Sequence, residues 1–593
     1  MDKDNLRTIW FTVIAAAILI LYQIYVLGPI AQRREAEAKA KAVAIAKTPL
    51  IAAPAGSSVF VTRAQAVAGS PRARIDTPAL EGSISLKGGR LDDLYLKDYR
   101  ETLAKDSPPV ELFRPEGAKD AYFFEAGWVG GVAAPGPGTI WTKTAGEVLA
   151  PGKPVVLSYD NGQGLVFTRT FAVDERYMFT VTDKVENRSP RPAALAAYAS
   201  VQRQGTPSLT SNWLVNEGAV GSVDGVLKEI PFKKWKKDGN QSGTTHGGYM
   251  GITDKYWLAA VAPDPGRAVK AEFKVSSVNG VDVYEADFVG EQKTLAPGSA
   301  LSETTRLFAG AKKVSILQDY QKALGIPHFD DAVDWGWLWF LTRPMFVVLQ
   351  FFYKILGNFG LAILGLTVVV KALMFPLANK SYESMSKMKK LQPEIDEIRK
   401  RHPDDPGKQQ QEIMAFYQRE RVNPLAGCVT ILPTIPVFYS LYTVLTVTIE
   451  MRQAPFFGWI HDLSAGDPTT FVNLFGLIPW NPAATPMIGG FLDGPLHLGV
   501  WPLLYGFAMW LSTAMTPQQT ADPTQKLMMQ VMPLMFVFIM GRYPAGLLIY
   551  WTWSQALSIL QQYVIMHRYG AENPIDDAIA RLTGGRAEAA SKG

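Results

Sequence analysis

One lysine lies well inside an apolar run whose other charge, Lys354, stands at its start, and the type and position of this lysine are the first suggestion of chemistry in the sequence. Lys371 comes five residues before Pro376, so at helical rise it lies about 7 to 8 Å from that end of the run. Thr367 comes four residues earlier, on the same face of a helix. An ammonium and a hydroxyl on one face predict a polar stripe that attracts anionic groups. Alternatively, a lone lysine near the end of a span snorkels to the interface, and both interpretations stay open here.

The last apolar run, from Gly546 to Met566, carries several polar and aromatic side chains. They are Tyr550, Trp551, Thr552, Trp553, Ser554, Gln555 and Ser558. The preceding run, from Leu527 to Met540, is short against a hydrocarbon core of about 30 Å. Together the two runs fit a locally thinned bilayer beside a wet concavity. An interfacial belt of Trp551 and Trp553 is the competing interpretation, but it explains the serine and glutamine less well.

The sequence offers no recognisable catalytic, metal or nucleotide chemistry. It contains no Gly-x-x-x-x-Gly-Lys phosphate loop, and its apolar runs lack the acidic or interior histidine residues that ion-coupled transporters use. The only cysteine, Cys428, excludes disulfides and cysteine-rich metal sites. We therefore expect no enzyme activity, no catalytic residues, no bound metal and no cofactor.

The elements that must position these residues follow from an uneven composition. Overall, 48% of the 593 residues are hydrophobic and 19% are charged. Six long apolar segments nevertheless contain only two charged side chains, Lys354 and Lys371. This distribution excludes a purely soluble protein, a disordered chain and a bundle of membrane helices alone. The net charge of +5 argues against nucleic acid as a direct partner.

Short alternating runs, separated by turn residues, fill residues 58–326. The run from Tyr177 to Val185 alternates in this way, and Asp160 to Gly162 is a strong hairpin turn. Because helices and strands do not alternate regularly, the pattern predicts a large antiparallel β-sandwich. Residues 327–352 are rich in aromatic side chains and interrupted by Pro344, which predicts an amphipathic helix in the outer interface.

A polar stretch, residues 377–423, predicts a helical hairpin and sets the orientation of the chain. It contains ten lysines and arginines and eight acidic residues, whereas the loop from Glu450 to His497 contains one arginine and four acidic residues. By the positive-inside rule the hairpin and both termini are cytoplasmic and the β-sandwich is periplasmic. A solvated charged face is the alternative for the hairpin, and Pro393 is expected to kink its first arm. The candidate contacts for incoming chains are Lys387, Lys389, Lys390, Arg399, Lys400 and Arg401.

The predicted fold is a polytopic α-helical membrane protein with six transmembrane helices, a large periplasmic all-β sandwich domain and a cytoplasmic helical hairpin. Its parts, in order, are an N-terminal signal-anchor helix (1–27), a linker (28–57), the β-sandwich (58–326), the interfacial helix (327–352), a second span (353–376), the hairpin (377–423), a third span (424–449), a periplasmic loop (450–496), a fourth span (497–515), a cytoplasmic loop (516–526), a fifth span (527–541), a sixth span (544–566) and a cytoplasmic tail (567–593).

A series of short motifs runs through the membrane part of the chain, from about residue 335 to 569. They are Lys371-Ala-Leu-Met-Phe-Pro-Leu, Ser381-Tyr-Glu-Ser-Met-Ser-Lys-Met, Leu391-Gln-Pro, Val422-Asn-Pro-Leu-Ala-Gly-Cys428, Pro436-Val-Phe, Arg452-Gln-Ala-Pro-Phe, Trp459-Ile-His-Asp-Leu-Ser, Asp522-Pro and Tyr543-Pro-Ala-Gly-Leu. In order and spacing they resemble the YidC/Oxa/Alb family of membrane protein insertases. The anchor and periplasmic sandwich resemble the long form of Gram-negative bacteria in architecture.

The resemblance implies a five-helix insertase core with a hydrophilic groove, open to the cytoplasm and to lipid and closed outside. The family has an arginine in this groove, and the matching residue here is Lys371, which keeps the charge and loses the planar fork. The candidate groove residues are Lys371, Thr367, Thr434, Thr513, Tyr550, Trp551, Ser554 and Gln555. The implied function is to insert integral membrane proteins into the inner membrane, and to help them fold and assemble, alone or with the Sec translocon.

The implied partners are nascent or newly made integral membrane proteins, the Sec translocon and membrane lipids, with targeting factors and the ribosome as further candidates. The tail from Arg568 has four basic and four acidic residues, which gives little support for ribosome docking by charge. Two other functions stay open: a polar-solute transporter or channel, and a membrane-anchored periplasmic carbohydrate-binding protein. Residues 467–496 look like an insertion in the second outer loop and have no assigned role.

Overall fold

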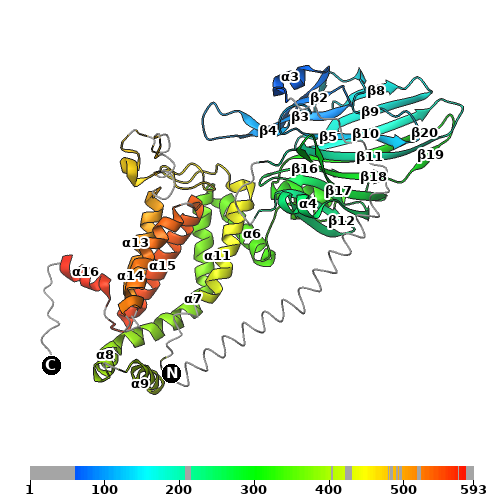
Figure 1. Ribbon diagram of the computed structural model, residues 1–593. Helices are drawn as coiled ribbons and strands as arrows, with labels where there is room; N and C mark the ends of the chain where they lie inside the picture. The colour runs from blue at the N-terminus through cyan, green and yellow to red at the C-terminus, as the bar shows by residue number, and fades with distance from the viewer. Residues whose placement is uncertain are drawn as a thin grey trace.

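The computed structural model describes residues 60–582, apart from 208–214, 403–404, 421, 423–430, 517–522, 542, 572 and several positions within 479–496. The expected N-terminal anchor and linker, and the end of the tail, lie outside the described residues. Figure 1 shows a β-rich part, coloured blue to green, and a bundle of helices, coloured green to red, which meet near α6.

Two large sheets form the β-rich part. One has the strand order β14-β17-β18-β11-β5-β3-β2-β1-β7, with β19 on β11 and β4 on β3, and the other has the order β13-β12-β15-β16-β20-β10-β9-β8-β6. The strands are β1 Arg72–Asp76, β2 Leu80–Ser85, β3 Arg90–Arg100, β4 Pro109–Phe113, β5 Tyr122–Gly130, β6 Thr142–Ala145, β7 Val148–Leu149, β8 Val155–Asp160, β9 Leu165–Val173, β10 Met178–Asn187, β11 Ala193–Gln204, β12 Gly218–Val223, β13 Val226–Pro231, β14 Gln241–His246, β15 Tyr249–Thr253, β16 Trp257–Ala262, β17 Ala268–Val278, β18 Val281–Gly290, β19 Lys293–Leu295 and β20 Ala300–Ala311.

The faces of the two sheets pack together, as the alternating pattern predicts. Burial alternates residue by residue along β9, and the turn at Asp160 to Gly162 joins β8 to β9 as an antiparallel hairpin. Arg169 ties the two layers together, since it is 1% exposed and pairs with Asp183 of its own sheet at 2.7 Å. Its guanidinium also donates to the carbonyl oxygen of Gly89 at 2.9 Å and to that of Ala126 in the other sheet. The predicted β-sandwich is therefore confirmed, and its strand pairs are antiparallel except for β1 with β7.

Helices make up the rest of the described chain. Within or beside the β-rich part they are α3 Arg63–Ala68, α4 Phe232–Asp238, α5 Val314–Leu324 and the 3-10 turn η2 Asp330–Ala332. The remainder are α6 Trp339–Leu356, α7 Phe359–Lys390, α8 Gln392–Arg401, α9 Pro406–Arg419, α11 Ile431–Val447, η3 Ile449–Met451, η4 Phe471–Gly476, α13 Val500–Met515, α14 Pro523–Met540, α15 Ala545–Arg568 and α16 Pro574–Leu582. In the bundle, α7 packs on α6 and α15, α13 packs on α14 and α15, and α11 packs on α6 and touches α15.

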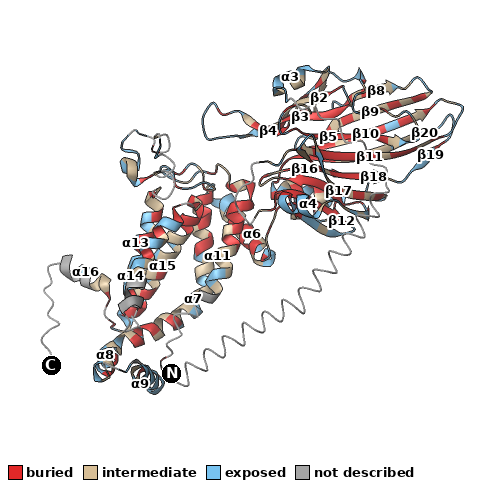
Figure 2. Ribbon diagram, viewed as in Figure 1, coloured by how far each residue is buried: buried red, intermediate tan, exposed pale blue. Residues whose placement is uncertain are grey.

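The outward faces of these helices are apolar. Figure 2 shows buried residues where α7, α11 and α15 face one another and exposed residues on the outer sides of the bundle. Many of the exposed side chains are large and hydrophobic, as Phe507 and Trp510 of α13 and Leu534 of α14 illustrate. In the described part of the chain α7 is the one helix that is both long and apolar enough to cross a membrane, and α11, α13 and α14 each contain a shorter apolar helix. An apolar surface of this extent fits lipid better than water.

Several helix ends differ from the predicted positions. The expected interfacial helix starts at Trp339 rather than at residue 327 and continues through Pro344. The break before the next helix lies at Gly357, which adopts a positive φ of 66°, and at Asn358, whose side chain caps α7 by accepting from the Leu361 N–H at 3.1 Å.

Two prolines also act differently from what the sequence suggested. Helix α7 runs without interruption through Pro376 to Lys390, so the span and the first arm of the hairpin form one helix. Pro393 lies in the first turn of α8, where its missing N–H leaves no hydrogen bond unmade, rather than kinking a longer arm. Helix α14 begins at Pro523 and has 18 residues, four residues before the predicted start.

The loop after α11 attaches the bundle to the β-sandwich. The Arg452 guanidinium donates to the carbonyl oxygen of Arg100 at 2.6 Å and lies 5.3 Å from the ring centre of Trp257. Glu450 Oε1 accepts from the Val314 N–H at 3.4 Å, while its Oε2 is buried without a partner among the described residues. Burial raises the pKa of Glu450 to about 7. The outer end of α11 therefore lies on the same side as the β-sandwich.

Acidification from pH 8 to pH 5 should stabilise this junction. The folded state favours protonated Glu450, so its contribution is complete below the ordinary pKa of 4.5 and is lost as the pH rises through about 7. Replacing Glu450→Gln should flatten the pH dependence of thermal unfolding, by about 3 kcal/mol at most. The matched control for the substitution itself is Glu101→Gln, at an exposed position beside the same junction. If the Glu450→Gln variant unfolds with the same pH dependence as the unchanged protein, the Glu450 carboxyl does not determine how the stability of the junction varies with pH.

Candidate functional site

Lys371 lies between two helices of the bundle and has a hydroxyl partner. It is half-buried on α7, and its Nζ donates to Ser558 Oγ of α15 at 2.6 Å. Ser558 in turn donates to the carbonyl oxygen of Ser554 at 3.0 Å and is also the side-chain hydrogen-bond partner of Tyr382. No carboxylate pairs with Lys371 among the described residues. The ammonium is therefore held in position while its charge stays uncompensated.

Ser558 was not among the predicted groove residues. Sequence spacing could have suggested it, because Ser558 follows Ser554 by four residues and so lies on the same face of α15. Its pairing with a lysine 187 positions away depends on how α7 packs against α15, and no local pattern reports that packing.

The three predicted threonines lie in three different environments. Thr367 is fully buried, and its hydroxyl donates to the carbonyl oxygen of Ile363 at 2.7 Å, one turn back on the same helix. Thr513 is half-buried and bonds in the same way to Met509 at 2.9 Å. Thr434 is exposed on α11. The hydroxyls of Thr367 and Thr513 are therefore occupied by their own backbones, as is common for threonine within helices.

Trp551 is at the centre of an aromatic cluster that joins three helices. Its ring centre lies 4.9 Å from that of Phe438 on α11, 5.6 Å from Tyr505 on α13 and 5.6 Å from Tyr543 before α15. By contrast, Trp553 is 36% exposed on the opposite face of α15. The belt interpretation therefore does not describe Trp551, while Trp553 lies on the outer surface of the bundle.

Other polar groups on α15 and α11 are enclosed in the bundle. Tyr550 is buried with Ser554 as a side-chain hydrogen-bond partner, and Gln555 is half-buried. Within the described chain, five further buried side-chain atoms on α11 and α15 have no hydrogen-bond partner: Ser440 Oγ, Thr446 Oγ1, Thr552 Oγ1, Gln561 Nε2 and Gln562 Nε2. Buried polar groups without partners are uncommon, and water or a bound chain would satisfy them.

The hairpin has a small core of its own and carries its basic residues outside. Met385, Met388, Ile395, Ile398, Ile413, Phe416, Tyr417 and Val422 form that core. Lys387 pairs with Glu383 at 3.0 Å, which holds the pKa of Glu383 below its usual value, and Arg399 pairs with Asp396 at 3.0 Å. The remaining predicted contacts are Lys389, which is half-buried, and Lys390, Lys400 and Arg401, which are exposed.

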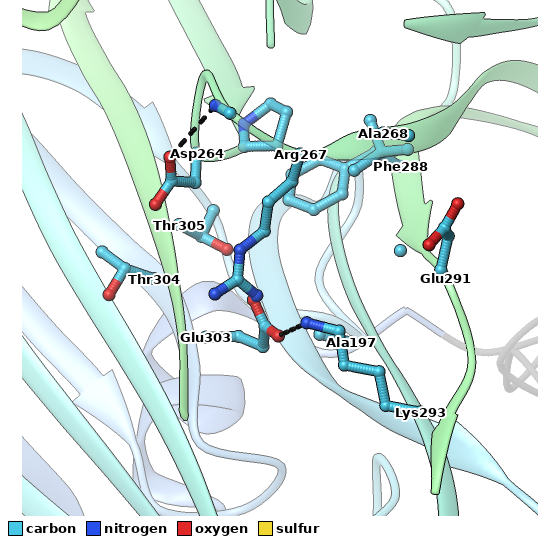
Figure 3. A pocket seen from close by; sticks show the side chains of 14 residues that line it. Ala197, Asp264, Arg267, Ala268, Phe288, Glu291, Lys293, Glu303, Thr304 and Thr305 are labelled. Atoms are coloured by element: carbon cyan, nitrogen blue, oxygen red, sulfur yellow. Dashed lines mark hydrogen bonds and ion pairs between the residues drawn. The ribbon is translucent and has the colours of Figure 1, made fainter. Parts of the chain in front are cut away.

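A separate cavity of about 200 Å³ lies in the β-sandwich, far from Lys371 in sequence (Figure 3). Its charged lining is internally paired, since Glu303 binds both Arg267 and Lys293, the latter at 2.9 Å. Across the described residues, no group of three histidine, cysteine, aspartate or glutamate side chains is arranged to hold a metal ion.

The fold and the site define an α-helical membrane protein that carries a large β-sandwich domain. Residues 72–348 match the YidC periplasmic domain, and residues 351–572 match the 60Kd inner membrane protein family. A protein of Caulobacter sp. (strain K31) named membrane protein insertase YidC is 52% identical to this chain, over 99% of it and 100% of the relative. A protein of the same name from Caulobacter vibrioides (strain NA1000 / CB15N) is 53% identical, over 98% of this chain and 99% of the relative.

A crystal structure of an active YidC insertase with its first transmembrane domain resolved is 18% identical, with a TM-score of 0.36, and covers 83% of this chain and 94% of that one. On the family matches and the full-length identities, the chain belongs to the YidC family of membrane protein insertases. The resemblance inferred from the motifs and the expected insertase class are thereby confirmed. The family places the protein in the inner membrane with its β-sandwich in the periplasm.

Trp551 and Trp553 provide a matched pair of substitutions on one helix. Replacing Trp551→Ala should destabilise the bundle by about 1.5 to 4.5 kcal/mol, because three aromatic contacts of about 0.5 to 1.5 kcal/mol each are lost. Replacing Trp553→Ala, on the outer face, should change stability by no more than about 0.5 kcal/mol. Thermal unfolding of the purified protein in detergent measures both. Equal shifts in the two variants would contradict the assignment of Trp551 as the packing centre.

Proposed function

We propose that this protein inserts newly made membrane proteins through a hydrophilic groove beside α7 and α15, in which Lys371 supplies the positive charge. The observation that carries the proposal is the contact between Lys371 Nζ and Ser558 Oγ at 2.6 Å, without a carboxylate partner in the described chain. The buried polar groups of α11 and α15 that have no partner support it, because they offer hydrogen bonds to a polar segment in transit.

The physical task is to move a polar tail across an apolar layer without hydrolysing a nucleotide. A charged side chain at the centre of a bilayer costs roughly 2.5 to 3.5 kcal/mol on insertion scales. Hydroxyls, amides and water in the groove lower that cost for the tail. The Lys371 ammonium attracts acidic residues of the tail, and the membrane potential pulls each one outward with about 2.3 kcal/mol per 100 mV. Burial of the client's apolar helix in lipid then drives its release.

The length of α13 supports a thinned bilayer around the groove. Of helices α11, α13 and α14, α13 has both of its ends within the described residues, and it has 16 residues. At about 1.5 Å per residue it is shorter than a hydrocarbon core of about 30 Å. In a thinner bilayer, the polar tail of the client crosses a shorter apolar layer. In the full topology that we propose, these helices, α7 and α15 form five spans, the N-terminal run supplies a sixth, and both termini are cytoplasmic.

The hairpin is proposed as the first contact for incoming chains on the cytoplasmic side. Its exposed lysines and arginines surround a packed core, so they form a rigid basic surface rather than a flexible tail. Targeting factors, the ribosome and the Sec translocon are the candidate partners for this surface. An electrostatic contact of this kind weakens as salt is added.

Substitution of Lys371 tests the charge in the groove. Replacing Lys371→Ala should reduce insertion of a small single-span client with an acidic tail about five- to tenfold, which corresponds to about 1 to 1.4 kcal/mol of lost attraction. Replacing Lys371→Arg should be tolerated because the charge remains. Protease protection of the client in vesicles that contain only this protein measures insertion. Lys354→Ala, an exposed lysine of α6, is the control and should insert normally. Full activity of Lys371→Ala would leave thinning without a charge as the mechanism.

Charge reversal on the hairpin tests the proposed contact surface. The double substitution Lys400→Glu with Arg401→Glu should lower insertion of ribosome-bound nascent chains, with little effect on a client added after synthesis. The reason is that only the first route depends on docking, and the loss should shrink at high salt, where docking is weak for every variant. Lys105→Glu, on an exposed loop of the β-sandwich, is the control. Equal losses on both routes would instead indicate damage to the bundle.

A further inference from the structure

A long uncharged segment follows the loop after α11 and displays its apolar side chains. The sequence contains no charged residue from Pro468 to Leu492. Within the described positions of 471–488, here named the outer apolar segment, eight large hydrophobic side chains are exposed. Their exposed fractions are Phe471 41%, Leu474 54%, Phe475 39%, Leu477 84%, Ile478 43%, Trp480 40%, Met487 104% and Ile488 52%. In water, a surface loop of this composition would expose a large apolar patch to the solvent, which is unfavourable.

The base of this segment is firmly attached to the start of α13. The buried Asp467 carboxylate accepts from the indole N–H of Trp459 at 3.1 Å, from the Thr469 N–H at 3.0 Å and from the Trp501 N–H at 2.9 Å. The Phe471 N–H donates to the carbonyl oxygen of Leu498 at 3.0 Å. The outer apolar segment therefore projects from a fixed platform at the N-terminus of α13.

The platform lies at the periplasmic end of the bundle. The same loop binds the β-sandwich through Arg452, and Figure 1 shows the segment, in yellow to orange, beyond the outer end of α13 and away from the sheets. Below it, Leu503, Leu504 and Phe507 of α13 are 38%, 44% and 61% exposed and belong to the apolar outer surface of the bundle. The segment thus continues a surface that already faces lipid.

We propose that the outer apolar segment lies in the outer leaflet of the membrane and binds lipid at the boundary between headgroups and acyl chains. Its lack of charge fits a neutral acyl environment and requires no anionic lipid. Trp480 is the kind of side chain that prefers this boundary. A soluble partner is disfavoured, because the segment offers no charged residue for specific recognition and starts at the N-terminus of α13, a helix whose outward side chains are apolar.

Site-specific fluorescence tests this location. The only cysteine is replaced (Cys428→Ser), and single cysteines are introduced at Leu477→Cys or Met487→Cys and labelled with an environment-sensitive nitrobenzoxadiazole dye. The labelled full-length proteins are reconstituted into phosphatidylcholine vesicles. Quenching is measured with lipids that carry a nitroxide on the acyl chain, and with aqueous iodide. Phe507→Cys on α13 is the lipid-facing control, and Lys105→Cys on the β-sandwich is the water-facing control.

If the proposal is correct, the dyes at 477 and 487 are quenched by the nitroxide lipids at least twofold more than the dye at 105, to a level near that at 507, and are protected from iodide. Quenching by iodide alone would overturn the proposal by placing the segment in water. Protection from both quenchers would also overturn it and indicate a protein occupant. Dilution into excess lipid then distinguishes a second copy, whose protection is lost, from an intramolecular contact. Retained client insertion by each labelled protein shows that it is folded.

Discussion

The position of the Lys371 ammonium within an apolar bundle depends on the close packing of α7 against α15. Its hydrogen-bond partner, Ser558, comes from α15, so α7 and α15 must run close together. Gly546 permits this approach at the start of α15, because a Cβ there would lie 3.1 Å from the Leu463 carbonyl oxygen and 3.3 Å from the Ile363 side chain. Gly506 does the same between α13 and α14, where a Cβ would lie 2.1 Å from Val537. Small residues thus set the helix spacing on which the charged contact relies.

At the periplasmic end of the bundle, the loop after α11 lies in two different environments. At its beginning, Glu450 and Arg452 bind the β-sandwich through polar and cation–π contacts. Beyond the Asp467 platform it becomes uncharged and apolar, next to the outward face of α13. The composition of the loop changes from polar to apolar where the chain leaves its contacts with the β-sandwich and reaches the outer end of α13. The loop therefore links the periplasmic domain to the edge of the membrane part through short hydrogen-bonded connections rather than through a flexible linker.

Composition and periodicity were enough to predict the β-sandwich, the apolar helices and the position of Lys371 within one of them, because each depends on local pattern. They could not predict which contacts form between helices. Thr367 lies on the same face of α7 as Lys371, yet its hydroxyl bonds to Ile363, a choice that spacing does not reveal. Trp551 and Trp553 are two residues apart and point to opposite sides, so only the packing of α11 and α13 decides which one is enclosed. Likewise, Pro376 does not end α7, because a proline fixes its own φ and removes one hydrogen bond, and the packed helix tolerates both.

The hydrogen-bond partner of Lys371 is a hydroxyl, and this explains how a half-buried ammonium can keep its charge available. A carboxylate beside Lys371 would neutralise it, and separating such a pair would leave two uncompensated buried charges. A serine hydroxyl fixes the position of the ammonium by a single neutral hydrogen bond, which contributes little net free energy and breaks at low cost. In the mechanism that we propose, an acidic client residue would replace the hydroxyl and would be released again once water or the membrane potential competes for it. Lysine suits this exchange, because its point charge binds without the bidentate geometry that would make an arginine–carboxylate pair more persistent.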